Sequence, residues 1–411
     1  MLLMRSIGVL VLVALGGGAC AAPEARTAQA WSVTTIATPA ASGSAQPQLS
    51  VSKRGVLLSW IEREGSRATL KFAERTSTGW TEPRTVASGD DWFVNWADVP
   101  SVLRMSDGSL KAHWLQKSGP DTYAYDVRLA SSRDDGRTWS ASVTPHHDGT
   151  QTEHGFASLF EMADGGLGLV WLDGRSKDAM SIRFGTFDTA WKQTGDMPVD
   201  LRVCDCCPTT AAVTSDGPIV AYRDRSEDEI RDISVSRLEN GAWTPPRTVH
   251  ADGWQIPACP VNGPVLSTRD RDVALAWFTV EGDQGRAFVA FSKDAGRTFS
   301  APIRLDDAGS LGRVDVELLE DGSAAASWIE FAEQRAQFRF RRVEPSGTRG
   351  PVTTIAGLEG TRASGYPRIA RNGDELVFAW TESRDGQLRV QTASARSTRY
   401  TDRSAPALLS R

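Results

Sequence analysis

Short apolar runs of alternating pattern follow one another along most of the chain, separated by Gly, Asp and Asn residues that favour turns. One unit recurs seven times: an apolar strand, a turn, and a second strand that ends in an aromatic residue. The units cover residues 47–60, 100–114, 156–171, 209–222, 264–277, 314–328 and 367–380. Their closing aromatic residues lie 51 to 57 positions apart, and most units continue into a third alternating strand.

A repeated unit of roughly 50 residues built from strands alone is typical of a β-propeller. A single four-stranded blade cannot bury both of its faces, whereas blades arranged around an axis cover one another. We therefore predict an all-β fold, one β-propeller over residues 31–399 with seven four-stranded blades; six blades are the alternative. The even spacing argues against two separate β-domains. Residues 31–37 are expected to complete the last blade and close the ring, leaving residues 400–411 as a C-terminal tail.

The first residues have the features of a secretory signal. Arg5 supplies positive charge, residues 7–15 are apolar, and small residues precede Cys20. This arrangement resembles a bacterial lipoprotein signal, in which that cysteine is lipidated and becomes the new N-terminus. We expect a signal peptide at residues 1–19, lipidation of Cys20 and a tether over residues 20–30, with ordinary secretion as the alternative. The protein is then predicted at the periplasm or cell surface, anchored to the outer membrane.

The charge of the chain is nearly balanced. It has 46 Lys and Arg residues against 51 Asp and Glu residues, a net charge of −5. A nucleic-acid-binding protein would gather a basic excess on one face, so no nucleic-acid partner is expected. We expect membrane contact only through the N-terminal lipid, and a monomer.

Two eight-residue segments share the pattern S-x-D-x-G-x-T-aromatic, at Ser132–Trp139 and Ser292–Phe299. They resemble the Asp-box, or bacterial neuraminidase repeat, of the sialidase superfamily; residues 77–80 and 239–243 look like shorter copies. The resemblance implies a sialidase-like propeller in which Asp and Gly form a tight turn between the third and fourth strands. These segments are therefore expected to be structural.

The same resemblance implies an enzymatic hypothesis, an exo-sialidase or a related glycoside hydrolase. Sialidases hold the substrate carboxylate with three arginines, and use a tyrosine nucleophile activated by a glutamate and an aspartate as acid/base. The candidates in this chain are Arg175, Arg225 and Arg384 for the clamp, Tyr366 with Glu330 for the nucleophile, and Asp98 for the acid/base.

Propeller topology places the segments before each first strand and after each second strand on one face. Acids and arginines gather in these segments, which suits an anionic or polyhydroxyl ligand. The alternative is one salt bridge per blade that holds a loop. The first functional hypothesis is a non-catalytic module for a glycan or other small polar ligand. Its candidate ligand-binding residues are Trp96, Asp173, Arg223, Asp224, Asn262 and Glu382.

Four cysteines stand in two such segments on neighbouring units. Cys204, Cys206 and Cys207 precede the fourth unit and Cys259 precedes the fifth, so the thiols should lie together near the axis. In an oxidising compartment, two disulfides are the simplest expectation. A thiolate metal site is the alternative, with His154 as an extra ligand and copper as the favoured ion. The cofactor stays unknown, and a metal-handling or redox protein is the third hypothesis.

Overall fold

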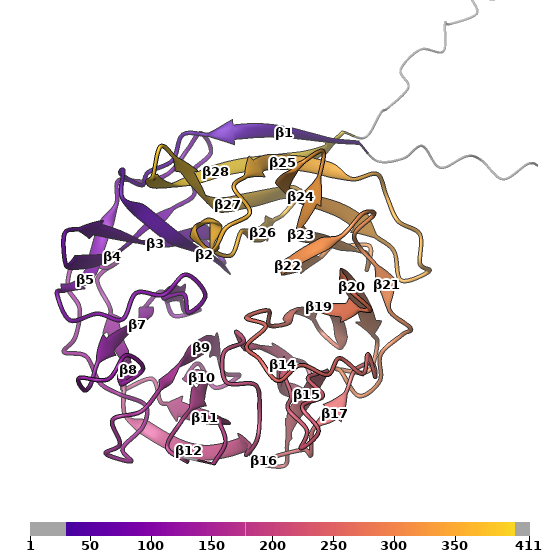
Figure 1. Cartoon of the computed structure of the whole chain (residues 1–411). Helices are drawn as coiled ribbons and strands as arrows, with labels where there is room; N and C mark the ends of the chain where they lie inside the picture. The colour runs from indigo at the N-terminus through magenta and orange to yellow at the C-terminus, as the bar shows by residue number, and fades with distance from the viewer. Residues whose placement is uncertain (1–29, 177, 399–411) are drawn as a thin grey trace, which may run out of the picture.

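Seven antiparallel sheets surround a central axis in the computed structural model of the protein, which describes residues 30–176 and 178–398 (Figure 1). The predicted all-β propeller is confirmed, with seven blades rather than six. The expected signal peptide, Cys20, the tether up to residue 29 and the C-terminal tail lie outside the described residues. Within the described ranges, no helix is long and apolar enough to cross a lipid bilayer.

The first three blades follow one another in the chain, each with its first strand nearest the axis (Figure 1). Blade 1 consists of β2 (Ser44–Ser52), β3 (Gly55–Glu64), β4 (Arg67–Glu74) and β5 (Arg84–Gly89). Blade 2 consists of β6 (Ser101–Arg104), β7 (Leu110–Lys117) and β8 (Tyr125–Ser132), and an isolated bridge between Leu129 and Val143 stands where a fourth strand would lie. Blade 3 consists of β9 (His154–Glu161), β10 (Leu167–Asp173), β11 (Ser181–Phe187) and β12 (Gln193–Asp200).

The remaining blades repeat this order. Blade 4 consists of β13 (Thr210–Thr214), β14 (Gly217–Arg223) and β15 (Ile233–Glu239), with two short outer strands, β16 (Ala242–Trp243) and β17 (Arg247–Thr248). Blade 5 consists of β18 (Val265–Arg269), β19 (Asp272–Glu281), β20 (Gln284–Ser292) and β21 (Ile303–Arg304). Blade 6 consists of β22 (Ser310–Leu318), β23 (Ala324–Ala332), β24 (Arg335–Val343) and β25 (Thr353–Leu358). After the 3-10 turn η1 (Arg362–Ser364), blade 7 consists of β26 (Arg368–Asn372), β27 (Glu375–Arg384), β28 (Gln387–Thr398) and β1 (Ala30–Ile36).

The N-terminal strand closes the ring as the sequence predicts. β1 pairs antiparallel with β28 in a continuous register that runs from Ala30 opposite Thr398 to Ile36 opposite Thr392. In Figure 1 the two strands lie side by side at the outer edge of blade 7. Both ends of the described chain therefore share one sheet, so blade 7 holds the ring together.

The second strand of each blade is the most buried, because neighbouring blades cover both of its faces. The closing tryptophans Trp60, Trp171, Trp277 and Trp328 are all 0% exposed. Three of these indoles donate to the acid two residues further along the strand. The bonds join Trp60 to Glu62 (2.9 Å), Trp171 to Asp173 (2.8 Å) and Trp328 to Glu330 (3.0 Å).

The first strands of neighbouring blades are joined by side chains rather than by sheet pairing. The Ser50 hydroxyl donates to the Val102 carbonyl (2.8 Å), which links blades 1 and 2. The Thr209 hydroxyl donates to the Phe156 carbonyl (2.8 Å), which links blades 4 and 3. Short polar side chains in the first strands therefore satisfy backbone groups around the axis that would otherwise lack partners.

The two S-x-D-x-G-x-T segments form the same turn between third and fourth strands. In blade 2, Asp134 accepts from the Thr138 amide (2.9 Å) and the Thr138 hydroxyl (2.7 Å). The Ser132 hydroxyl donates to Asp134 (2.9 Å) and accepts from an amide in the turn. Blade 5 repeats these contacts around Asp294. The segments stabilise turns, as the sequence predicts, and their Ser, Asp and Thr side chains form hydrogen bonds within the turn.

Candidate functional site

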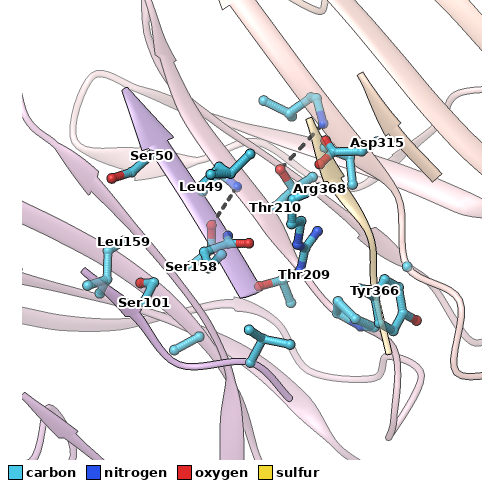
Figure 2. A pocket seen from close by; sticks show the side chains of 18 of the residues that line it. Leu49, Ser50, Ser101, Ser158, Leu159, Thr209, Thr210, Asp315, Tyr366 and Arg368 are labelled. Atoms are coloured by element: carbon cyan, nitrogen blue, oxygen red, sulfur yellow. Dashed lines mark hydrogen bonds between the residues drawn. The ribbon is translucent and has the colours of Figure 1, made fainter. Parts of the chain in front are cut away.

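A cavity of about 240 Å³ lies on the axis, and residues of all seven first strands line it. Figure 2 shows hydroxyl groups of Ser50, Ser101, Ser158, Thr209 and Thr210 on its wall, together with Asp315, Tyr366 and Arg368. We call this space the axial cavity. Most of its wall residues belong to the first strands, and the others, among them Asp98, Thr209 and Tyr366, lie in the segments that lead into these strands.

Three carboxyl groups stand in the axial cavity. Burial raises the pKa of Asp98 to about 7, that of Asp315 to about 6 and that of Glu317 to about 8. Asp98 accepts from the Phe156 amide (2.8 Å), and its other oxygen is buried without a hydrogen-bond partner. Near neutral pH the cavity therefore carries much less negative charge than its three carboxyl groups would carry in water.

Asp98 also lies beside a buried tyrosine. The Tyr125 hydroxyl donates to Glu153 (2.7 Å) and lies 3.4 Å from the same Asp98 oxygen that binds the Phe156 amide. Burial raises the pKa of Glu153 to about 7. Tyr125 is 0% exposed, so its hydroxyl serves to connect the two carboxyl groups.

A group of aromatic and arginine side chains lies beside the axial cavity, and two of its members, Tyr366 and Arg368, line the cavity itself. Trp96 stacks on Tyr366 with 5.9 Å between ring centroids and 16° between ring planes. The Arg313 guanidinium lies 4.8 Å and the Arg362 guanidinium 6.0 Å from the Trp96 ring, while Arg368 lies 5.5 Å from the Tyr366 ring. We call these five side chains the axial rim.

The three rim arginines differ from most arginines of the protein in their charge partners. Among the described residues, no carboxylate lies within 4.0 Å of Arg313, Arg362 or Arg368, although Asp315 and Arg368 attract each other at longer range. Arg313 donates to the Thr361 carbonyl and the Gly365 carbonyl, both at 3.0 Å. Burial lowers the pKa of Arg313, and the positive charge of Arg362 lowers it further. The axial rim therefore carries positive charge that no carboxylate of the described residues contacts directly.

The arginines expected to form a clamp are each paired with carboxylates of their own neighbourhood. Arg175 binds Asp173 (2.7 Å), Arg225 binds Glu229 (2.7 Å), and Arg384 binds Glu382 (2.9 Å). The Arg384 side chain is 79% exposed. These contacts correspond to the alternative reading of one salt bridge per blade.

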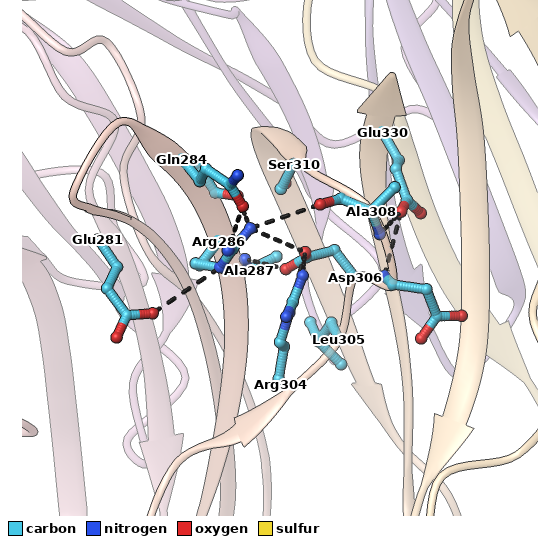
Figure 3. A network of polar contacts seen from close by, with 12 residues as sticks. Glu281, Gln284, Arg286, Ala287, Arg304, Leu305, Asp306, Ala308, Ser310 and Glu330 are labelled. Carbon is cyan, nitrogen blue, oxygen red and sulfur yellow. Dashed lines mark hydrogen bonds and ion pairs between the residues drawn. The ribbon is translucent and has the colours of Figure 1, made fainter. Parts of the chain in front are cut away.

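The expected pair of Tyr366 and Glu330 does not form. The Tyr366 hydroxyl donates to the Val261 carbonyl (2.5 Å) and the ring is 2% exposed. Glu330 accepts from the Asp307 amide (3.1 Å) and the Ala308 amide (2.5 Å), as Figure 3 shows. The Trp328 indole and Arg339 bind its other oxygen, so Glu330 stabilises blade 6 instead of activating the tyrosine.

Two of the predicted ligand-binding residues also have structural roles. Arg223 is 1% exposed and donates to three backbone carbonyls, those of Asn262, Arg231 and Phe278. Asp224 accepts from the Ser234 hydroxyl (2.8 Å), and burial raises its pKa. Both side chains are therefore engaged in contacts within the protein.

The cysteines gather beside the axial rim, as the sequence predicts. The Cys204 sulfur lies 3.3 Å from that of Cys207 and 4.0 Å from that of Cys206. All four described cysteines are free thiols, so the two expected disulfides are not present in the structure. A sulfur–sulfur bond is about 2.05 Å long, well below these separations.

Local contacts favour a thiolate at Cys204. Hydrogen bonds from the thiols of Cys206 and Cys207 lower the pKa of Cys204, and Arg231 donates to its sulfur (3.2 Å). The Asn262 amide donates to the Cys207 sulfur (3.4 Å), and the Asn262 side chain accepts from the Arg313 amide (2.8 Å). Asn262 thus connects the cysteine cluster to the axial rim.

His154 does not approach the thiols. Its ring stacks on that of His146, with 3.7 Å between the centroids, and it faces three aspartates of blades 2 and 3. Sequence reasoning also missed Glu317, Arg362 and Arg368 as site residues. Arg362 lies in the segment before β26 and Arg368 is the first residue of β26, on either side of Tyr366. Their closeness in sequence to Tyr366 was the available signal.

No family model matches the chain, and no curated protein matches it by sequence. Its structure is similar to that of a protein of unknown function from Dyadobacter fermentans, at 13% identity and TM-score 0.51, covering 89% of this chain and 98% of that chain. It is also similar to the polysaccharide lyase Uly1, at 11% identity and TM-score 0.52, covering 86% and 90%. The NanB sialidase from Streptococcus pneumoniae aligns at 10% identity and TM-score 0.48, covering 90% and 94%. At these identities the likeness shows the fold alone, a β-propeller.

Proposed function

We propose that the protein is a glycan-binding propeller that takes an acidic saccharide at the axial rim. The observation that carries the proposal is the group of three arginines without a close carboxylate partner around Trp96 and Tyr366. Guanidinium groups bind carboxylates through paired, charge-assisted hydrogen bonds, and a uronic or sialic acid unit offers such a carboxylate.

The axial cavity below the rim suits the rest of such a ligand. Hydroxyl groups and protonated carboxyl groups line it, and these groups can donate to and accept from sugar hydroxyls. A protein with a similar fold is described as a polysaccharide lyase, so the fold is also found in a protein that acts on polysaccharides. A volume of about 240 Å³ admits one sugar unit at most, so the remainder of a longer glycan would lie on the rim.

Calorimetric titration with oligosaccharides tests this proposal. A uronate-containing oligosaccharide is expected to bind, and its neutral counterpart to bind at least tenfold more weakly. Arg362→Gln is expected to raise the Kd of the acidic ligand about 10- to 100-fold, because one charge-assisted contact contributes about 1.5–3 kcal/mol.

Arg384→Gln is the matched control, because Arg384 is an exposed arginine of blade 7 whose partner is Glu382. Equal affinity of Arg362→Gln and wild type for the acidic ligand would contradict the proposal. Cleavage of the bound oligosaccharide would instead identify a glycoside hydrolase or lyase.

A second candidate function rests on the three sulfurs of Cys204, Cys206 and Cys207, which lie within 4.8 Å of one another. Soft thiolates so placed suit Cu(I). Anaerobic titration against a chromophoric Cu(I) chelator is expected to show one tightly bound ion per chain, lost in Cys206→Ser. Retention of that ion in the variant, or titration of two disulfides in place of free thiols, would exclude this function.

We also propose that the protein lies in the cell envelope, because the N-terminal sequence resembles a lipoprotein signal. Wild-type protein is expected in the membrane fraction and to incorporate labelled palmitate. Cys20→Ser is expected to release it to the soluble fraction, and an unchanged distribution without label would indicate ordinary secretion.

A further inference from the structure

A second polar cluster lies where blades 2 and 3 meet, apart from the axial rim and the cysteines. It contains Asp126 at the start of β8, His146 and Asp148 in the connection between the blades, His154 at the start of β9, and Asp173 at the end of β10. His146 is 6% exposed and His154 is 0% exposed. None of the functions proposed above uses these side chains.

The two imidazole rings are parallel and share their carboxylate neighbours. The ring planes differ by 6°, and the centroids are 3.7 Å apart. One nitrogen of each ring faces the same oxygen of Asp126, at 3.8 Å from His146 Nε2 and 3.5 Å from His154 Nδ1. The other nitrogens face one oxygen of Asp148, at 3.4 Å from His146 Nδ1 and 3.2 Å from His154 Nε2.

The atoms that point toward Asp126 lack hydrogen bonds. Asp126 Oδ1, His146 Nε2 and His154 Nδ1 are all buried, and none of them has a hydrogen-bond partner in the described part of the chain. On the opposite side of the rings, His154 Nε2 and Asp148 Oδ2 also lack such a partner. Leaving one such buried atom without a partner destabilises the folded protein, so three that face one another require an explanation. A bound cation would satisfy all three at once.

We propose that Asp126, His146 and His154 form a binding site for a divalent transition-metal ion of the zinc class. Two imidazoles and one carboxylate are a frequent ligand set for such ions. With metal–ligand bonds of about 2.0–2.1 Å, tetrahedral ligands stand about 3.3–3.4 Å apart, against 3.8 Å and 3.5 Å from Asp126 to the two imidazole nitrogens. An imidazole binds a metal in the plane of its ring, so one of the two stacked rings must turn for both to reach one ion. Three protein ligands leave the fourth position for water or another molecule.

Asp148 supports this geometry from the opposite side. Metal-bound histidines commonly give their second nitrogen to a carboxylate, which fixes the orientation of the ring. Asp148 faces both second nitrogens and is itself held by the Thr150 amide (2.9 Å). Asp148 is therefore a positioning residue for the two histidines.

The ion belongs on the Asp126 side because the other side already holds a cation. The Arg175 guanidinium lies 3.4 Å from Asp148 and 2.7 Å from Asp173. Its charge opposes a second cation there, whereas the Asp126 side chain is 21% exposed and opens a path for an ion. The site would also join β8 to β9, and so blade 2 to blade 3.

The other reading of the cluster is a network without metal, in which His154 carries a proton. The three aspartates raise the pKa of His154 in spite of its burial, so a proton competes with an ion there. The two readings differ in whether added metal stabilises the protein.

Titration of chelator-treated, full-length protein with Zn²⁺ and Co²⁺ distinguishes them. We expect one Zn²⁺ per chain, a higher melting temperature with the ion, and a Co²⁺ spectrum without thiolate charge-transfer bands. His146→Gln is expected to weaken Zn²⁺ binding at least 100-fold and to abolish the thermal shift. Asp126→Asn, which keeps the shape of a partly exposed side chain, is expected to weaken it at least tenfold.

Two controls separate this site from other sources of binding. His147→Gln removes a neighbouring exposed histidine, bound to Gln193 (2.8 Å), and is expected to bind Zn²⁺ as the wild type does. Cys206→Ser tests the thiols and is expected to keep this ion. Wild-type affinity in both His146→Gln and Asp126→Asn, or loss of the ion in Cys206→Ser, would overturn the proposal. If His146→Gln does not fold, Asp126→Asn decides alone.

Discussion

Glu62, Asp173 and Glu330 each accept a hydrogen bond from the tryptophan two residues before them. This contact explains why an acid follows the closing tryptophan in several repeats, a pattern that the sequence also allowed as a ligand-binding mouth. A buried indole N–H needs an acceptor, and the acid supplies it without leaving the strand. At the residue scale, the recurring acids therefore stabilise the blades.

Asp98→Asn is expected to flatten the dependence of stability on pH. Burial raises the pKa of Asp98 from 3.8 to about 7 in the folded protein. As the pH rises, this carboxyl ionises in the unfolded protein before it ionises in the folded protein. The contribution of neutral Asp98 to the free energy of unfolding is therefore complete below about pH 4 and is lost by about pH 7. A shift of about three units corresponds to at most about 4 kcal/mol. Urea unfolding between pH 4 and 8 measures the difference.

Asn keeps the acceptor for the Phe156 amide, so the fold should persist. Asp315 and Glu317 leave part of the pH dependence in place, because burial raises the pKa of each as well. Asp121→Asn, in an exposed loop, is the control and should follow the wild type. If the free energy of unfolding changes with pH with the same slope in Asp98→Asn and in the wild type, the pKa of Asp98 is not raised as its burial requires.

At the scale of elements, the turns between third and fourth strands connect neighbouring blades. Gly136 has a φ of 78°, and a Cβ built there would lie 2.5 Å from the Phe72 ring in β4 of blade 1. Gly296 has a φ of 79° and approaches Ile219 of blade 4 in the same way. Each turn therefore packs on the preceding blade, which requires the absence of a side chain at this glycine.

Gly136→Ala is expected to destabilise the protein by about 2–4 kcal/mol. The left-handed backbone costs a residue with a Cβ about 1 kcal/mol, and the clash with Phe72 adds about 1–3 kcal/mol. Gly108→Ala is the matched control, because its φ is 87° and nothing lies within 4 Å of its Cβ position. Chemical unfolding gives both values. Equal losses in the two variants would show that packing between blades contributes nothing at this turn.

At the scale of the whole molecule, one sheet contains both ends of the described chain. Trp31 in β1 packs edge-on against Phe340 of blade 6, with 5.6 Å between ring centroids. β1 therefore contacts two blades at once: it pairs with β28 of blade 7, and its Trp31 side chain packs against blade 6. Opening the ring would expose the faces of both blades.

Trp31→Ala is expected to lower the melting temperature of the entire ring in a single transition. Losing this partly buried ring costs about 1–3 kcal/mol. Trp191→Ala is the control for lost apolar contact away from the closing strand, because this partly buried ring packs on Phe187 of blade 3 and lies 4.7 Å from Lys111 Nζ of blade 2. Differential scanning calorimetry measures both variants. A separate early transition, with the rest melting as in wild type, would show that closure does not couple the blades.

The number of blades, the closing strand and the turns could be predicted because each depends on residues close in sequence or on a repeated pattern. The closing aromatics, Asp-Gly turns and the strand at residues 31–37 all belong to this class. The meeting of the four cysteines could be predicted for the same reason, since Cys204 and Cys259 occupy equivalent places in neighbouring repeats.

The partners of charged side chains could not be predicted in this way. Arg175, Arg225 and Arg384 have carboxylates of their own nearby, whereas Arg362 and Arg368 do not. A sequence shows which residues are charged but not which groups lie within 4 Å of them, because those distances depend on loops from several blades.

The sequence by itself determined a ring of seven blades closed by its ends, because periodic burial and turn chemistry act locally in every repeat. Only the tertiary structure decided which polar groups have no close partner within the protein and so remain available to bind a ligand or a metal ion. It placed unpaired arginines at the axis and brought Asp126, His146 and His154 together. A buried atom without a partner is recognised only when everything around it is in place, and these are the atoms from which ligand and metal binding are inferred.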